Sequence, residues 1–175
     1  MNRFSAPRFR TAALSFAVLA AALALPASAS LFHHHAAAAP QPAAPVTSAA
    51  APGTVAPVLR TLNAQRAASH LRQLAFDAHL AAVAQGHAED MARRNYFSHV
   101  TPEGLDPFAR MRRAGYRFGY AGENIALNAD VVSAHDLIWR DPPHRAIVLG
   151  PNFQRVGIGA ARGRNGVVLV EDYSD

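Results

Sequence analysis

Hydrophobic residues recur at helical spacing in the middle of the chain, most regularly between residues 77 and 94. Apolar side chains there follow i, i+3, i+4, i+7 spacing, which is the pattern of one buried helix face. Asp77 precedes the pattern and has a side chain suited to capping the first backbone N–H groups. The spacing predicts a helix over this stretch. A weaker pattern predicts another helix over about 55–70, with residues 71–76 as a connection.

Two more helices are predicted farther along the chain. Asp106-Pro107 has the form of an N-cap followed by proline at the first helical position, and Gly115 marks the end of this short helix. A fourth helix is expected to start near Asp130, with its apolar residues on one face. Pro142-Pro143 is expected to end this helix or to bend the chain sharply.

The last part of the chain has the pattern of a β-hairpin. Two apolar, strand-like runs at residues 156–160 and 167–170 flank Arg164-Asn165-Gly166. Asn-Gly between two such runs is a strong hairpin signal. Helices first and an antiparallel pair of strands last predict an α+β domain.

The first 54 residues differ from the rest in composition. Three arginines precede an apolar run over residues 11–25, and Ala27-Ser28-Ala29 is a small-x-small cleavage site. The run is shorter than the about 20 residues of a membrane-spanning helix. We therefore predict a cleaved signal peptide at 1–29 and no integral membrane segment after cleavage. Residues 30–54 are rich in alanine and proline, which predicts a flexible linker and leaves one domain at 55–175.

Charge and cysteine content narrow the class of protein. The 17 basic residues, all arginine, stand against 12 acidic ones. Removing the three arginines of the predicted signal leaves 14 against 12, a net charge of +2. We expect no nucleic-acid partner, because such binding needs clustered basic charge on one face. The chain has no cysteine, so the exported domain must be held together by its apolar core.

Two histidines and a glutamate stand in apolar and aromatic sequence, each with glycine or proline within three residues. They are His99, Glu123 and His144. Two neutral imidazoles and a carboxylate form a three-ligand set that can hold zinc and leave a fourth position open to water. The alternative is that these residues only tie segments together. Glu123 would then cap backbone N–H groups, and His144 would bond a carbonyl near the Pro-Pro bend.

Neighbouring residues carry different expectations. Ser98 and His99 are adjacent in an extended segment and point to opposite faces, which argues against a nucleophile and base pair. His87 lies on the apolar face of its helix and is expected to be a hydrogen-bonded core residue. A basic stretch, which we expect to be a solvated face or a contact for anionic lipid or cell-wall polymer, comprises Arg110, Arg112, Arg113 and Arg117.

A series of short motifs follows in a fixed order over about 120 residues, nearly all of the chain after the linker. The motifs are Asn63-x-x-Arg66, Phe97-Ser98-His99, Gly122-Glu123-Asn124-Ile125-Ala126, Trp139 with His144-Arg145, Pro151-x-Phe153 and Val156-Gly157-Ile158-Gly159. The ordered set resembles the CAP superfamily, named for cysteine-rich secretory proteins, antigen 5 and plant pathogenesis-related 1 proteins, in its cysteine-free bacterial form.

The resemblance implies an α-β-α sandwich with a small central antiparallel sheet between helical layers. It also implies a cleft with two histidines and two acidic residues. In this sequence the cleft would hold His99, Glu123 and His144, with Asn124 and Trp139 beside them. The second acidic position of the pattern falls at Pro142, with Asp141 offset by one. We therefore expect a tetrad that is incomplete or completed differently.

These expectations favour a periplasmic or extracellular binding module that is not an enzyme. Its His/Glu cleft would accept a small molecule, a lipid or a divalent cation, with zinc as the first candidate, and a cell-envelope component is a further possible partner. The alternative is a metal-assisted hydrolase of peptide or cell-envelope material. In it, His99 and His144 would hold the metal, and Glu123 would be the third ligand or the general base. A third interpretation is a structural domain in which the histidines brace loops.

Overall fold

The computed structural model describes residues 52–175, so the predicted signal peptide and most of the predicted linker lie outside the described residues. The elements are α1 (Pro52–Ala68), β1 (Ala75–Phe76), α2 (Ala78–Arg94), α3 (Pro107–Arg113), β2 (Ala121–Asn128), α4 (Val131–Arg140), α5 (Pro142–Val148), β3 (Arg155–Gly163) and β4 (Gly166–Ser174). None of the helices in this part has the length and apolar character that a membrane span requires.

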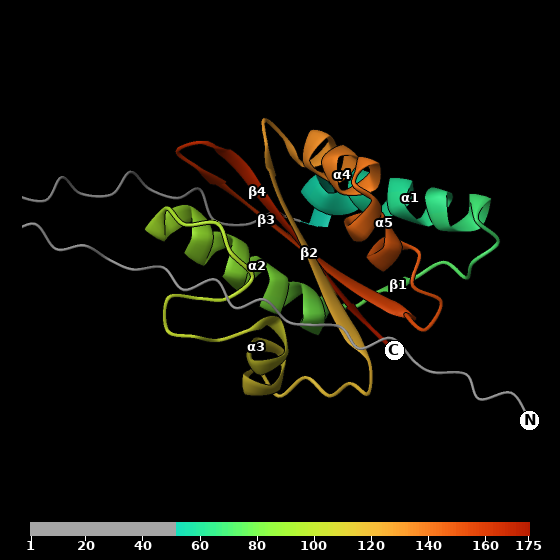
Figure 1. Cartoon of the computed structure of the whole chain (residues 1–175), viewed down its shortest axis with the longest axis horizontal. Coiled ribbons are helices and arrows are strands. Elements are labelled where there is room, and N and C mark those ends of the chain that lie inside the picture. Colours follow the sequence, from blue (N-terminus) through green and yellow to red (C-terminus); the bar gives the residue numbers. More distant parts are fainter. Residues whose placement is uncertain (1–51) are drawn as a thin grey trace, which may run out of the picture. The chain divides into compact units, whose positions relative to one another are not determined.

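The four strands form one sheet between two layers of helices (Figure 1). The strand order is β1-β3-β4-β2, which leaves β2 at an edge. Helices α2 and α3 cover one face, and α1, α4 and α5 cover the other. The expected α-β-α sandwich is confirmed. The sheet is mixed, because residues 75–76, expected to be only a connection, pair with β3 in parallel.

Local capping signals place the starts of three helices. The side chains of Asp77, Asp106 and Asp130 each accept backbone N–H groups at the starts of α2, α3 and α4. Helix α1 starts earlier than its apolar pattern indicates, at Pro52, which lies within the predicted linker. Proline is tolerated there because the first helical N–H groups have no partner inside the helix.

Helix α2 lies with its backbone directly on strand β3. A Cβ atom added to Gly157 would lie 2.3 Å from backbone atoms of Leu80 and Ala81, and one added to Gly159 would lie 2.2 Å from the backbone nitrogen of Gln85. The Gln85 side chain bonds both backbone groups of Ala160, at 3.0 and 3.1 Å. Glycine is therefore required in β3 by the closeness of the helix.

On the other face, Arg66 holds the end of α5 in place. Its guanidinium is fully buried and donates to the carbonyls of Val148 (2.7 Å), Gly150 (3.0 Å) and Arg72 (2.8 Å). Burial lowers the pKa of Arg66 below the ordinary value for arginine. This residue ties α1 to the segment that follows α5 and so fixes the helix that carries His144.

The contact of α2 with β3 predicts opposite effects for two glycine substitutions. Gly159→Ala should lower the free energy of unfolding by about 3 kcal/mol or more, because the new methyl group meets helix backbone. Gly86→Ala on α2 is the control, since no atom lies within 4 Å of the added Cβ. It should raise the stability by about 0.5–1 kcal/mol. Urea unfolding of both variants tests this, and equal effects would contradict the close approach.

Candidate functional site

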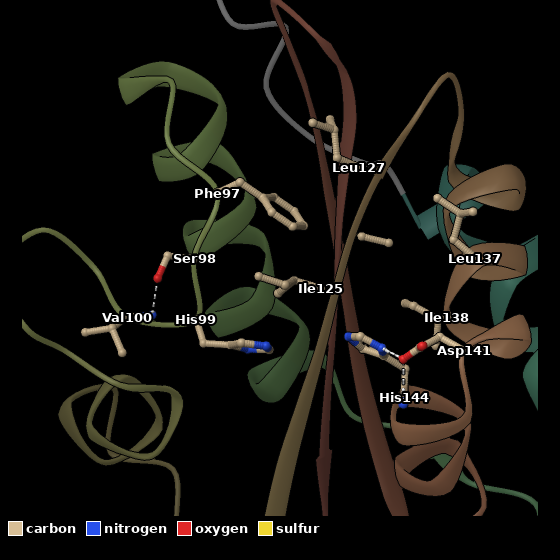
Figure 2. A pocket seen from close by; sticks show the side chains of 11 residues that line it. Phe97, Ser98, His99, Val100, Ile125, Leu127, Leu137, Ile138, Asp141 and His144 are labelled. Atoms are coloured by element: carbon tan, nitrogen blue, oxygen red, sulfur yellow. Dashed lines mark hydrogen bonds and ion pairs between the residues drawn. The ribbon is translucent and has the colours of Figure 1, made fainter. Parts of the chain in front are cut away.

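A groove of about 840 Å³ lies along β2 between two walls (Figure 2). One wall is the loop 97–100 that follows α2, and the other is formed by α4 and α5. The lining is mostly apolar, with Phe97, Val100, Leu137 and residues 125–127 among its members. Polar side chains enter from both walls, and they include both predicted histidines.

His99 is held by a buried carboxylate. Its Nδ1 lies 2.7 Å from Oε1 of Glu123, whose side chain is only 1% exposed. A carboxylate oxygen accepts hydrogen bonds, so Nδ1 of His99 is the donor of this bond. Figure 2 shows the His99 ring directed from the loop toward β2.

Arg110 compensates the charge of Glu123, a role that the sequence did not indicate. Nη2 of Arg110 donates to Oε2 of Glu123, and Nη1 donates to the carbonyls of His99 (2.6 Å) and Leu105 (3.1 Å). The side chain of Arg110 is 9% exposed. The expectation of a solvated basic face is therefore wrong for this residue, although it is confirmed for Arg112, Arg113 and Arg117, which are exposed. Arg110 lies one turn after the N-cap of α3, and its guanidinium reaches Glu123 on β2 from there.

His144 is paired with Asp141. Asp141 separates α4 from α5 and is the N-cap of α5, and its Oδ2 accepts both the backbone N–H (3.4 Å) and the Nδ1–H of His144. The hydrogen bond from His144 lowers the pKa of Asp141 below its usual value. The amide of Asn124 donates to the carbonyl of His144 at 3.1 Å, which ties α5 to β2. The structural alternative predicted a bond from the His144 ring to a backbone carbonyl. The ring instead bonds the carboxylate of Asp141.

The two histidines thus reach one groove from opposite walls (Figure 2). Nδ1 of each histidine is bonded to a carboxylate, Glu123 for His99 and Asp141 for His144. Trp139 does not line the groove. It packs against the core, and the Arg145 guanidinium lies 5.8 Å from the centre of its ring. Within residues 52–175, no group of three or more His, Asp or Glu side chains is arranged to hold a metal ion. Metal binding by His99, Glu123 and His144 stays a prediction.

Two other side chains near the site behave as their sequence positions indicate. His87 is buried, and its Nε2 lies 3.0 Å from the carbonyl of Ser98, which confirms a hydrogen-bonded core histidine. Burial lowers the pKa of His87. Oγ of Ser98 accepts the backbone N–H of Val100 at 3.1 Å. Ser98 therefore serves the turn of the loop.

Asp172 is a further acidic residue of the site that sequence reasoning missed. It pairs with Glu123 across the β2–β4 ladder, and it is 1% exposed. Burial, followed by the negative charge of Glu123, raises the pKa of Asp172 well above its usual value, and the charge of Arg110 opposes this. The only signal in the sequence is a pair of carboxylates, Glu171 and Asp172, that directly follows the apolar run 167–170.

The raised pKa of Asp172 predicts a stability that depends on pH. The unfolded carboxyl ionises near pH 3.9, whereas the folded one stays neutral to higher pH. Wild type should therefore lose stability as the pH rises from about 4 through the folded pKa. Asp172→Asn cannot ionise, so its stability relative to wild type should rise between pH 4 and pH 8. Urea unfolding at both pH values measures this difference.

Exposed Asp136 provides the control for this measurement. Asp136→Asn removes a carboxylate on α4 that is 47% exposed and pairs with exposed Arg140. Its pH profile should follow that of wild type. Parallel profiles for wild type and Asp172→Asn would contradict the neutral buried carboxyl.

The fold has three layers, and its cleft holds two histidines that are each bonded to a carboxylate. These are the features of the class of protein that the sequence motifs imply. Residues 59–173 match the family described as CAP, the cysteine-rich secretory protein family. The chain belongs to this family. The uncharacterized protein YkwD of Bacillus subtilis (strain 168) is 33% identical over 118 residues, which are 65% of this chain and 46% of that protein.

Solved structures agree with this assignment. An extracellular protein containing a SCP domain from Bacillus anthracis is 31% identical, with a TM-score of 0.64 over 70% of this chain and 40% of that chain. This chain thus spans less than half the length of YkwD and of the Bacillus anthracis protein. An outer surface protein from Borrelia burgdorferi has a TM-score of 0.68 at 15% identity, over 74% of this chain and 98% of that chain, which shows the fold alone.

Proposed function

We propose that this CAP protein is an exported, non-enzymatic binding module. The observation that carries the proposal is the groove along β2, which is apolar over most of its lining and has a carboxylate-bound imidazole on each of its two walls. Such a groove suits a small ligand with an apolar part and one polar or anionic group. The apolar sequence at 11–25 and the extracellular and surface relatives support export.

The contacts within the site favour binding over catalysis. Both oxygens of Glu123 are engaged, one by His99 and one by Arg110, so neither is free to act as a general base. Catalytic zinc sites use three protein ligands and one open position. Here the groove offers two imidazole nitrogens from two separate walls.

Binding of an apolar, anionic dye tests the groove. Leu137 is 47% exposed on α4 and lines the groove, whereas Val132 is 49% exposed on the same helix and does not. Leu137→Ser should weaken the binding of 1-anilinonaphthalene-8-sulfonate about fivefold, since about 1 kcal/mol of apolar contact is lost. Val132→Ser is the matched control and should bind as wild type does. Fluorescence titration measures both, and equal affinities would remove the groove as the binding site.

A divalent cation is the second candidate ligand. An imidazole whose Nδ1–H is bonded to a carboxylate is the arrangement that orients histidine for metal binding, and both His99 and His144 have it. Calorimetric zinc titration should then show one ion per chain in wild type and none in His99→Ala or His144→Ala. His79→Ala is the control, because His79 is exposed and lies outside the groove. Absence of binding in folded wild type would remove the metal.

A turnover assay separates the hydrolase from the binding module. If zinc binds, turnover of casein or peptidoglycan that a chelator abolishes would support a metal-assisted hydrolase. Zinc binding without turnover would leave a cation-binding module.

A cell-envelope component is the partner that we propose for an exported protein of this type.

A further inference from the structure

The groove runs along the free edge of the sheet. Strand β2 is the last strand in the order and pairs only with β4. Ile125 packs with the cluster under α2, whereas Ala126 packs with the core on the α1 and α4 side. Both residues nevertheless line the groove. Side chains from opposite faces of one strand can line the same groove only where the groove follows the edge of the strand.

The register determines which backbone groups of β2 point into the groove. The two-residue turn Arg164-Asn165 closes at the pair Gly163–Gly166, which is the hydrogen-bonded pair of a two-residue hairpin. Even-numbered residues of β4 therefore bond to β3, and odd-numbered ones bond to β2. In the β2–β4 register, the odd-numbered residues of β4 face even-numbered residues of β2.

A bond just beyond the ladder confirms this assignment, because the backbone N–H of Asp175 donates to the carbonyl of Tyr120 at 3.0 Å. The N–H and C=O groups of Ile125 and Leu127 consequently point away from β4. Within residues 52–175, none of these outward groups has a backbone or side-chain hydrogen-bond partner. A row of unpaired backbone donors and acceptors lies in a groove that is lined by apolar side chains.

We propose that the groove binds an extended peptide segment, which adds to the sheet as a fifth strand beside β2. This inference rests on the proposed binding function and names the chemical class of the ligand. An added strand satisfies the outward N–H and C=O groups of Ile125 and Leu127, as in other cases of strand addition to a sheet edge. An acyl chain or sterol of equal size fills the groove but leaves these backbone groups unpaired, which carries a free-energy cost.

The two walls suit the alternating side chains of such a strand. Successive side chains of the peptide fall on opposite faces of the extended sheet. One set meets Phe97 and Val100, which are 48% and 44% exposed, and the other meets Leu137, which is 47% exposed. The outward edge from Glu123 to Leu127 spans about 13 Å at about 3.3 Å per residue. The site therefore takes four or five residues with apolar side chains on both faces.

Amide hydrogen exchange tests the pairing directly. The probe is the blocked pentapeptide Thr-Val-Leu-Val-Thr at saturating concentration with the purified protein. The amides of Ile125 and Leu127 should exchange rapidly in the free protein and at least about tenfold more slowly with peptide. The amides of Asn124 and Ala126 bond to β4 and should be protected in both states. This alternation along one strand is the signature of strand addition.

N-methylated peptides provide a matched control that leaves the protein unchanged. One peptide is methylated on both valine nitrogens, which removes the donors of the two valines from one edge. The other is methylated on the leucine nitrogen, which removes the central donor of the opposite edge. Because only one edge of the peptide faces β2, fluorescence polarisation should show at least about a tenfold loss of affinity for one methylated peptide and little loss for the other. Equal affinities for the two peptides would overturn the proposal.

The remaining outcomes of the dye, peptide and exchange measurements each decide between the proposals. Dye binding without any effect of peptide on Ile125 and Leu127 would overturn the peptide inference and leave the binding module standing. Absence of both would remove the proposed function as well. Protection of Ile125 and Leu127 in the free protein that increases with protein concentration would identify a second copy of the chain as the occupant, and it would also overturn the proposal.

Discussion

The direct contact between the backbone of α2 and strand β3 determines where the rest of the site lies. With no side chain at Gly157 and Gly159, the helix rests on the sheet and has no room to move closer or to shift along β3. Its C-cap Asn95, in the left-handed conformation with φ 54°, then turns the chain at a set position. The loop that follows forms one wall of the groove and brings His99 to Glu123 on the edge strand.

The need to balance the buried charge of Glu123 is a second constraint on the site. A buried carboxylate such as Glu123 needs a compensating charge or full hydrogen bonding. Arg110 supplies the charge, and it also donates to the carbonyl of His99, so one guanidinium holds both the acid and the loop. Asp172 lies opposite Glu123, and its pKa is raised well above the usual value, first by burial and then by the charge of Glu123, which favours the neutral form of this second acid.

Local signals explain what the sequence could predict. The N-cap aspartates and the Asn165-Gly166 signal act within a few residues, and the helices and hairpin that they predict are present, with the turn itself at Arg164-Asn165. Strand β2 was not predicted, because its residues 123–126 are buried on both faces and show no alternation. Arg110 and Asp172 acquire their roles only from a partner on another element. Arg110 bonds Glu123, which lies 13 residues farther along the chain, and Asp172 lies opposite Glu123 on the neighbouring strand. Pairs of this kind leave no recognisable pattern in the sequence around either residue.

The second carboxylate of the site follows from helix capping. The family pattern places an acid at Pro142, and its offset to Asp141 suggested an incomplete tetrad. Helix α5 begins at Pro142, which makes Asp141 the N-cap and His144 the third helical residue, where an N-cap side chain reaches. The cap that starts α5 therefore also binds Nδ1 of His144. Each wall thus presents an imidazole that is oriented by its own carboxylate, and the edge of β2 lies between the two walls as the surface that a ligand must meet.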